Sequence, residues 1–200
     1  MGTKRATVDL GEFAPPAMRM VRWKGNPVGG YVPFTVDAAV YMLPDGTLYV
    51  GNGMTGEVRV LRGGVARKFA VAWTADPVDD GDVEDWRTFL REQAANPIQR
   101  VNAERFIDYA GFPDHKPYFS RMIVDDSGNI WFGPYVYRTT PGSWAPADST
   151  SWVVADSIGR PVARVMLPPR FIPKQIASGT VVGIQRDDDD VRYVQTYHLK

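Results

Sequence analysis

The sequence predicts an all-β protein that is built from repeated antiparallel sheets and carries one inserted helical hairpin. The first observation is a motif of glycine, Thr or Asn, an apolar-aromatic-apolar run and a closing glycine, which occurs at 46–51 and at 128–133. A degenerate copy follows at 179–183, and a Val-Ala-Arg tripeptide recurs at 65–67 and 162–164. Strand-like runs flank each copy, so the repeated unit is a small antiparallel sheet.

The composition is that of a folded globular chain without a dominant charge. Of 200 residues, 44% are hydrophobic and 12% aromatic, and 23 Lys and Arg balance 23 Asp and Glu. We therefore expect no nucleic-acid partner. The chain has no cysteine, which excludes disulfides, thiol catalysis and cysteine-bound zinc. No apolar run is long enough to predict a membrane span, and the sequence does not open with a signal peptide. The compartment stays open, since a longer parent chain with a signal peptide would lie outside the cytoplasm.

Residues 1–35 are predicted to form N-terminal strands and an excursion. Strands are expected at about 5–12 and 17–23, on either side of a Pro-Pro pair, and the Gly- and Pro-rich residues 24–30 are expected to leave the sheet. The first complete blade-like sheet follows within 36–72. Its strands are expected at about 36–43, 47–51, 56–62 and 65–72, separated by turns rich in Gly, Asn and Asp.

Residues 79–111 change from a strand period to a helix period. Val83, Trp86, Phe89 and Leu90 fall on one helical face, behind three aspartates that complement a helix N-terminus. This pattern predicts a helix over about 82–94. Asn96 followed by Pro97 predicts the start of a second helix, which Gly111 ends.

The rest of the chain returns to the strand pattern. A second sheet within 118–168 has strands at about 118–124, 129–136, 150–156 and 160–167, with a Pro-, Gly- and Ser-rich loop at 139–150. A last sheet within 171–200 has only three strands, at about 171–177, 179–185 and 190–199. Such meanders are the blades of β-propellers, so the chain contains about three blades in a single domain.

The arrangement of these sheets resembles the C-terminal half of bacterial six-bladed β-propeller proteins of the NHL-repeat and TolB-like group. The resemblance rests on residues 44–51, 58–60, 124–131, 152–168 and 193–199 and covers nearly the whole chain. It implies half of a six-bladed ring. Because a closed ring needs more than three blades, the chain is expected to be a fragment of a longer protein or to form a homodimer that completes the ring. In the dimer, residues 5–13 of each copy would complete the partner's last sheet.

The resemblance also implies that the first strand of each blade lines a central channel. The polar residues on these strands are Asp37, Ser120, Arg121, Lys174 and Gln175, which we expect to form a ligand-binding rim. A non-catalytic binding or scaffolding module is therefore predicted, with a peptide, a glycan or a protein surface as its ligand. The alternative is a metal-dependent hydrolase of the lactonase type, with Asp37 as one metal ligand.

Other motifs that carry chemistry are weak. Asp187, Asp188, Asp189 and Asp190 are weak calcium candidates, but they lie between two predicted strands, where aspartate favours turns. His115 and His198 lack zinc-ligand spacing. The sequence contains no phosphate-binding loop and no serine nucleophile motif. We therefore predict no cofactor and name no catalytic residue.

Overall fold

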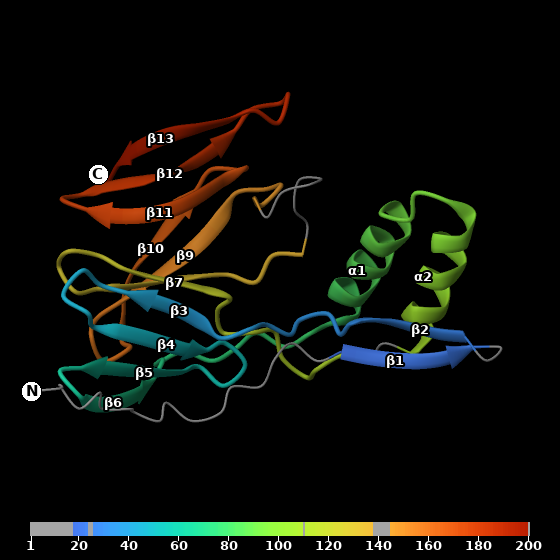
Figure 1. Ribbon diagram of the computed structural model, residues 1–200, viewed down its shortest axis with the longest axis horizontal. Coiled ribbons are helices and arrows are strands. Elements are labelled where there is room, and N and C mark those ends of the chain that lie inside the picture. Colours follow the sequence, from blue (N-terminus) through green and yellow to red (C-terminus); the bar gives the residue numbers. More distant parts are fainter. Residues whose placement is uncertain (1–17, 24–25, 110, 138–144, 200) are drawn as a thin grey trace, which may run out of the picture.

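The computed structural model describes residues 18–23, 26–109, 111–137 and 145–199, which form four antiparallel sheets and two helices. Figure 1 shows two lobes: three sheets lie on the left, and the helical hairpin with a two-stranded sheet lies on the right. The predicted predominance of strands and the predicted helical hairpin are confirmed. The strand expected at 5–12 lies outside the described residues.

The first two large sheets are four-stranded meanders in which each strand pairs with the next one in the chain. In the first, Gly46, Gly63 and Gly64 all adopt positive φ in the turns, as tight hairpins require. Its strands are β3 (Ala39–Met42), β4 (Leu48–Asn52), β5 (Glu57–Arg62) and β6 (Val65–Ala70). The strands of the second are β7 (Arg121–Val124), β8 (Ile130–Gly133), β9 (Thr150–Ala155) and β10 (Pro161–Leu167).

The third large sheet has three strands among the described residues, as predicted. They are β11 (Phe171–Ala177), β12 (Thr180–Arg186) and β13 (Arg192–His198), in that order across the sheet. A register irregularity between Pro173 and Gln175 leaves Lys174 without a cross-strand partner. This β-bulge bends β11 and redirects the Lys174 side chain.

The second sheet lies between the other two, and its strands β7, β8 and β9 bury side chains on both faces. Met122, Phe132 and Ile130 point to one face and pack in a core with residues of the first sheet. Successive side chains of a strand point to opposite faces, so Ile123 and Trp131 point to the other face and pack in a core with the third sheet. This explains why every residue of β8 is buried.

The first strands of the three sheets lie next to one another. β3 contacts β7, and β7 contacts β11, so the three strands line one side of the left lobe (Figure 1). From this side the first sheet extends downward and the third extends upward in the view. Among the described residues the sheets do not close into a ring.

The right lobe combines β1 (Met18–Trp23), β2 (Asn26–Tyr31), α1 (Asp80–Glu92) and α2 (Pro97–Tyr109). Asp79 caps α1 through a reciprocal pair of hydrogen bonds with Asp82, and Asn96 accepts a hydrogen bond from the Gln99 backbone N–H at the start of α2. A separate core holds the lobe together, in which Trp86 of α1 and Phe106 of α2 pack with Phe34.

One assignment from the sequence was wrong. Residues 24–30 were expected to be an excursion, but Asn26–Tyr31 form β2 and pair with β1 along its whole length. A Cβ at Gly30 would lie 3.0 Å from the Phe106 ring, so this glycine lets the strand approach α2 closely. Tertiary packing therefore turns a loop-like sequence into a strand.

Candidate functional site

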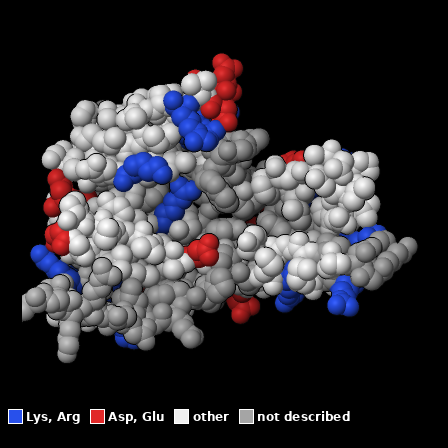
Figure 2. Space-filling view, viewed as in Figure 1, with Lys and Arg blue, Asp and Glu red and all other residues white. Residues whose placement is uncertain are grey.

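A hollow of about 840 Å³ opens on the side where β3, β7 and β11 meet. Four of the side chains that line it are basic, and we call this set the basic cleft: Arg121 of β7, Lys174 of β11, Arg186 of β12 and Arg192 of β13. Tyr41 and Trp152 add aromatic surface. No carboxylate belongs to the described residues that line the hollow. Figure 2 shows Lys and Arg side chains gathered on this face of the left lobe.

Two of the four cations are held against each other by the strand register. Arg186 and Arg192 are direct cross-strand partners at the β12–β13 hairpin, an arrangement in which like charges repel. Arg186 is only 6% exposed and forms an ion pair with Asp190 at 2.5 Å. For Arg192 and Lys174, both exposed, no ion pair is present within the described part of the chain. The cleft thus has a surplus of positive charge.

Arg121 is half-buried and lies deeper than the exposed Lys174 and Arg192. Burial lowers the pKa of its guanidinium from the ordinary arginine value. Because an arginine remains charged at neutral pH, this position holds a positive charge in partly desolvated surroundings. An anion that reaches Arg121 interacts with it more strongly than with a fully hydrated cation.

A second hollow, of about 770 Å³, lies between α1 and the large sheets. We call it the aromatic groove, because seven aromatic side chains from both lobes line it: Tyr31, Trp86, Phe89, Tyr135, Tyr137, Trp152 and Phe171. Ser120, Arg121, Trp152 and Pro173 line both hollows. The basic cleft and the aromatic groove are therefore adjacent, with Arg121 on the boundary between them.

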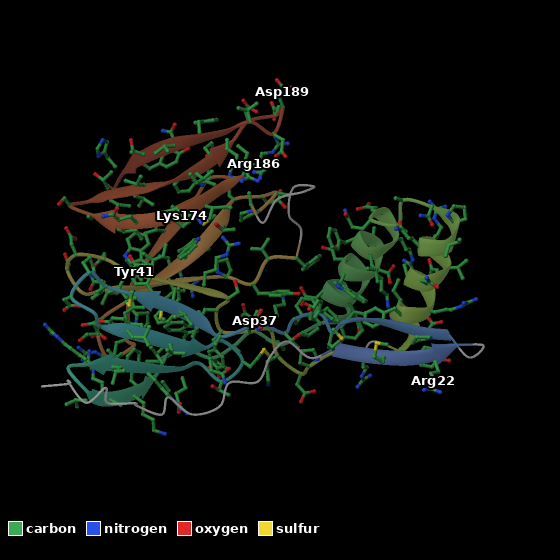
Figure 3. All side chains as sticks on the ribbon, in the orientation of Figure 1. Arg22, Asp37, Tyr41, Lys174, Arg186 and Asp189 are labelled. Atoms are coloured by element: carbon green, nitrogen blue, oxygen red, sulfur yellow. The ribbon has the colours of Figure 1, made fainter. Side chains whose placement is uncertain are left out.

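Four of the five residues predicted from the sequence line one or both of the hollows. Ser120 and Arg121 line both, and Lys174 lines the basic cleft. Asp37 lines only the aromatic groove, where it is exposed and lies between the lobes (Figure 3). Gln175 lines neither hollow. The Ser120 hydroxyl donates to the Pro134 carbonyl oxygen at 2.5 Å, which gives it a structural role.

Arg186 and Arg192 were not among the residues predicted for the site. Both flank the acidic run at 187–190, and the hairpin around that run places them opposite each other. The sequence signal for these two arginines was a basic residue on each side of the turn predicted between two strands. Trp152 was also missed, because nothing in the sequence indicates which core aromatics border a hollow.

The acidic run between β12 and β13 forms a turn. One carboxylate oxygen of Asp187 accepts hydrogen bonds from the backbone N–H groups of Asp189 and Val191, at 3.1 and 2.9 Å. Asp125 and Asp156 make the same two bonds in their own turns. Asp188 and Asp190 pair with arginines. Within the described residues, no group of three or more His, Cys, Asp or Glu is placed to hold a metal ion.

No protein-family model matches this chain, and no curated protein or solved structure matches it. Among the helices that the structure describes, none is long and apolar enough to cross a membrane. Inferences about function therefore rest on the two hollows and the residues that line them.

Proposed function

We propose that this chain is a non-catalytic binding module whose basic cleft binds a ligand that carries carboxylates. The three large sheets are proposed to be three blades of a six-bladed propeller, with the basic cleft on the channel side. Two features support this reading: the first strands of successive sheets are neighbours, and the middle sheet has a covered face on each side. The proposed relationship is to the NHL-repeat and TolB-like propellers.

The observation that carries the proposal is the concentration of four cations in a hollow lined by no described carboxylate. The Arg186 guanidinium is already paired with Asp190, whereas Lys174 and Arg192 are exposed and have no ion pair among the described residues. A bound carboxylate would accept charge-assisted hydrogen bonds from the Lys174 ammonium and the Arg192 guanidinium. Each such bond contributes about 1.5–3 kcal/mol.

The ligand class follows from the shape and charge of the cleft. A hollow of about 840 Å³ is large enough for a short segment of a chain molecule rather than for a single ion. Acidic peptides, acidic glycans and acidic surfaces of other proteins all present carboxylates in series. Since basic and acidic residues balance over the whole chain, the charge is local to the cleft, and we propose no nucleic-acid partner.

The test is the binding of a hexaglutamate peptide, measured by isothermal titration calorimetry at low and at physiological salt. Lys174→Glu and Arg192→Glu are each expected to weaken binding by about tenfold or more, equivalent to roughly 1.4 kcal/mol. Arg22→Glu is the matched control, because it changes the net charge equally but lies at the far end of the right lobe (Figure 3). Equal effects of all three substitutions would indicate nonspecific attraction, and absence of binding to the unaltered protein would refute the proposal.

The lactonase-type alternative requires several oxygen or imidazole ligands around one metal ion. Asp37 is the one carboxylate that the described lining of either hollow contains. A calcium-dependent lactonase activity that disappears in Asp37→Ala would favour this alternative over the binding module.

A further inference from the structure

We propose that the basic cleft and the aromatic groove form one binding site, and that its ligand is an acidic peptide with an aromatic side chain beside its carboxylates. In this arrangement the carboxylates lie along the cleft and the aromatic side chain enters the groove. The inference rests on the proposed function, because it assigns the ligand of the same cleft.

The first argument is that the two hollows are adjacent and share part of their lining. Arg121 and Trp152 line both hollows, so a chain that places a carboxylate at Arg121 has its next residues at the entrance to the groove. An acidic residue and an apolar residue adjacent in sequence therefore reach both hollows without a long linker. At about 770 Å³ the groove has the size of an ordinary ligand pocket.

The second argument is charge complementarity, which also sets the direction of the ligand. The cleft has four cations and no described carboxylate, whereas the groove shares one of these cations, Arg121, and has the Asp37 carboxylate at its exposed side. Asp37 repels a second carboxylate in the groove, so the acidic part of the ligand is directed toward Lys174 and Arg192. The groove then receives an uncharged side chain.

The third argument is the surface that the groove presents. Tyr31 is 64% exposed at the groove, and Met18 beside it is 60% exposed, so large apolar side chains face water there. Two rings of the groove, Phe89 and Tyr137, meet at a steep angle of 66° with centroids 5.5 Å apart. Another aromatic ring joins such a cluster edge-to-face with favourable geometry.

The Ser and Thr hydroxyl groups of the groove favour a peptide side chain over a sugar. Three Ser and Thr hydroxyls line the groove, and each already takes part in an internal hydrogen bond: Thr35 donates to the Val32 carbonyl, Ser120 to that of Pro134, and Thr150 accepts from Trp152. A sugar needs polar partners for its own hydroxyls, whereas an aromatic side chain needs only apolar surface. An acidic peptide is therefore the better complement.

The experiment compares two blocked peptides, Glu-Glu-Glu-Phe and Glu-Glu-Glu-Ala, by isothermal titration calorimetry with the full chain. We expect the phenylalanine peptide to bind about tenfold or more tightly, because its ring is removed from water in the groove. Binding of the alanine peptide tests the basic cleft alone. If both peptides bind equally, the groove inference is wrong while the proposed function stands. If neither binds, both are wrong.

Two variants test whether the groove provides the higher affinity of the phenylalanine peptide. Tyr31→Ala is expected to remove most of the advantage of the phenylalanine peptide and to leave the affinity for the alanine peptide unchanged. Tyr109→Ala is the matched control, because Tyr109 is 57% exposed in the same lobe but lines neither hollow. Equal losses for both peptides in Tyr31→Ala would overturn the inference. A trigalacturonate that binds as tightly as the phenylalanine peptide would also overturn it, in favour of a glycan.

Discussion

The indole N–H of Trp131 donates a hydrogen bond of 3.0 Å to a carboxylate oxygen of Asp125, inside the turn that joins β7 to β8. The same carboxylate accepts from the backbone N–H groups of Ser127 and Asn129. Asp125 is buried, and Trp131 belongs to the core between the second and third sheets. A turn and a core are thus joined through one side chain.

The first prediction is that Asp125→Ala lowers the free energy of unfolding by about 3 kcal/mol, because buried N–H groups lose a charged acceptor. Asp156→Ala is the matched control, since Asp156 makes the same two turn bonds at a more exposed site and accepts from no indole. The control is expected to lose less stability. Chemical denaturation followed by tryptophan fluorescence measures both variants, and equal losses would contradict the importance of the indole bond.

The second prediction concerns the closing glycine of the second motif copy. A Cβ at Gly133 would lie 2.7 Å from the Trp152 ring, so Gly133→Ala displaces the ring that lines both hollows. We expect this substitution to cost roughly 1–3 kcal/mol of stability and to weaken binding of the acidic peptides.

Gly128→Ala in the same hairpin separates backbone strain from displacement of Trp152. Gly128 has φ of +83° and no atom near its added Cβ, so its substitution costs about 1 kcal/mol through the backbone alone. Peptide affinity should be unchanged in this control. Unchanged affinity in Gly133→Ala as well would mean that Trp152 does not shape the site.

The third prediction is that Trp86→Ala lowers the free energy of unfolding by about 3–5 kcal/mol, the usual cost of truncating a large buried aromatic. The Trp86 ring packs against Phe106 and Phe112 in the core of the right lobe. Ile98→Ala on α2 is the control, because Ile98 is highly exposed. Circular dichroism during denaturation checks whether the helices melt with the sheets, and an unchanged stability would mean that this core does not hold the helices.

Much of the fold was predictable because the signals for it are local. Turn glycines and strand alternation located the strands of the three large sheets to within a few residues, and the Asn96-Pro97 pair marked the start of α2. The strand β2 was missed because Pro27 and Gly30 are typical of loops, and only pairing with β1 and packing on Phe106 make it a strand.

The site was less predictable, because it depends on how distant segments meet. Lys174 and Arg121 were expected to share one rim, and they line one cleft. Asp37 was assigned to the same rim but lines only the groove, since it precedes β3 and lies between the lobes. The groove itself exists because α1, which begins at Asp80, far along the chain from the start of β3 at Ala39, folds back opposite the sheets. No periodicity in the sequence encodes that approach.

The fourth prediction concerns pH and the ion pair between Asp82 and Lys116, whose charged atoms are 2.7 Å apart. Partial burial alone would raise the pKa of Asp82, but hydrogen bonds from Lys116 and from the Asp79 backbone lower it below the usual value. A carboxyl group whose pKa is lower in the folded state than in the unfolded state stabilises the folded state at pH values above the unfolded-state pKa. This contribution is lost as the pH falls through the folded-state pKa.

We therefore expect Asp82→Asn to lower the free energy of unfolding by less than about 1 kcal/mol at pH 7, because solvent screens the ion pair. Below about pH 4 this loss of stability is expected to become progressively smaller. Asp80→Asn, in the same helical turn but without an ion pair among the described residues, is expected to cost less at neutral pH. Denaturation curves at several pH values measure the difference. A cost for Asp82→Asn that stays constant down to acidic pH would contradict the assignment.

The last prediction is that two copies of the chain associate to complete the ring. The second sheet is covered on both faces, but the first and third each keep one face that no other described sheet covers. Exposed apolar side chains lie on those faces, among them Met42 of β3 and Val194 of β13, which is 69% exposed. A two-fold dimer that pairs the first sheet of one copy with the third sheet of the other covers both faces at once and buries more than about 1,000 Å².

Val194→Asp is expected to shift the protein toward monomer in sedimentation velocity. Val65→Asp, at a hairpin tip with 70% exposure, is expected to leave association unchanged. A specific dimer of that area associates well below about 100 μM. A protein that stays monomeric at all concentrations up to that value would therefore leave the three sheets as an open arc.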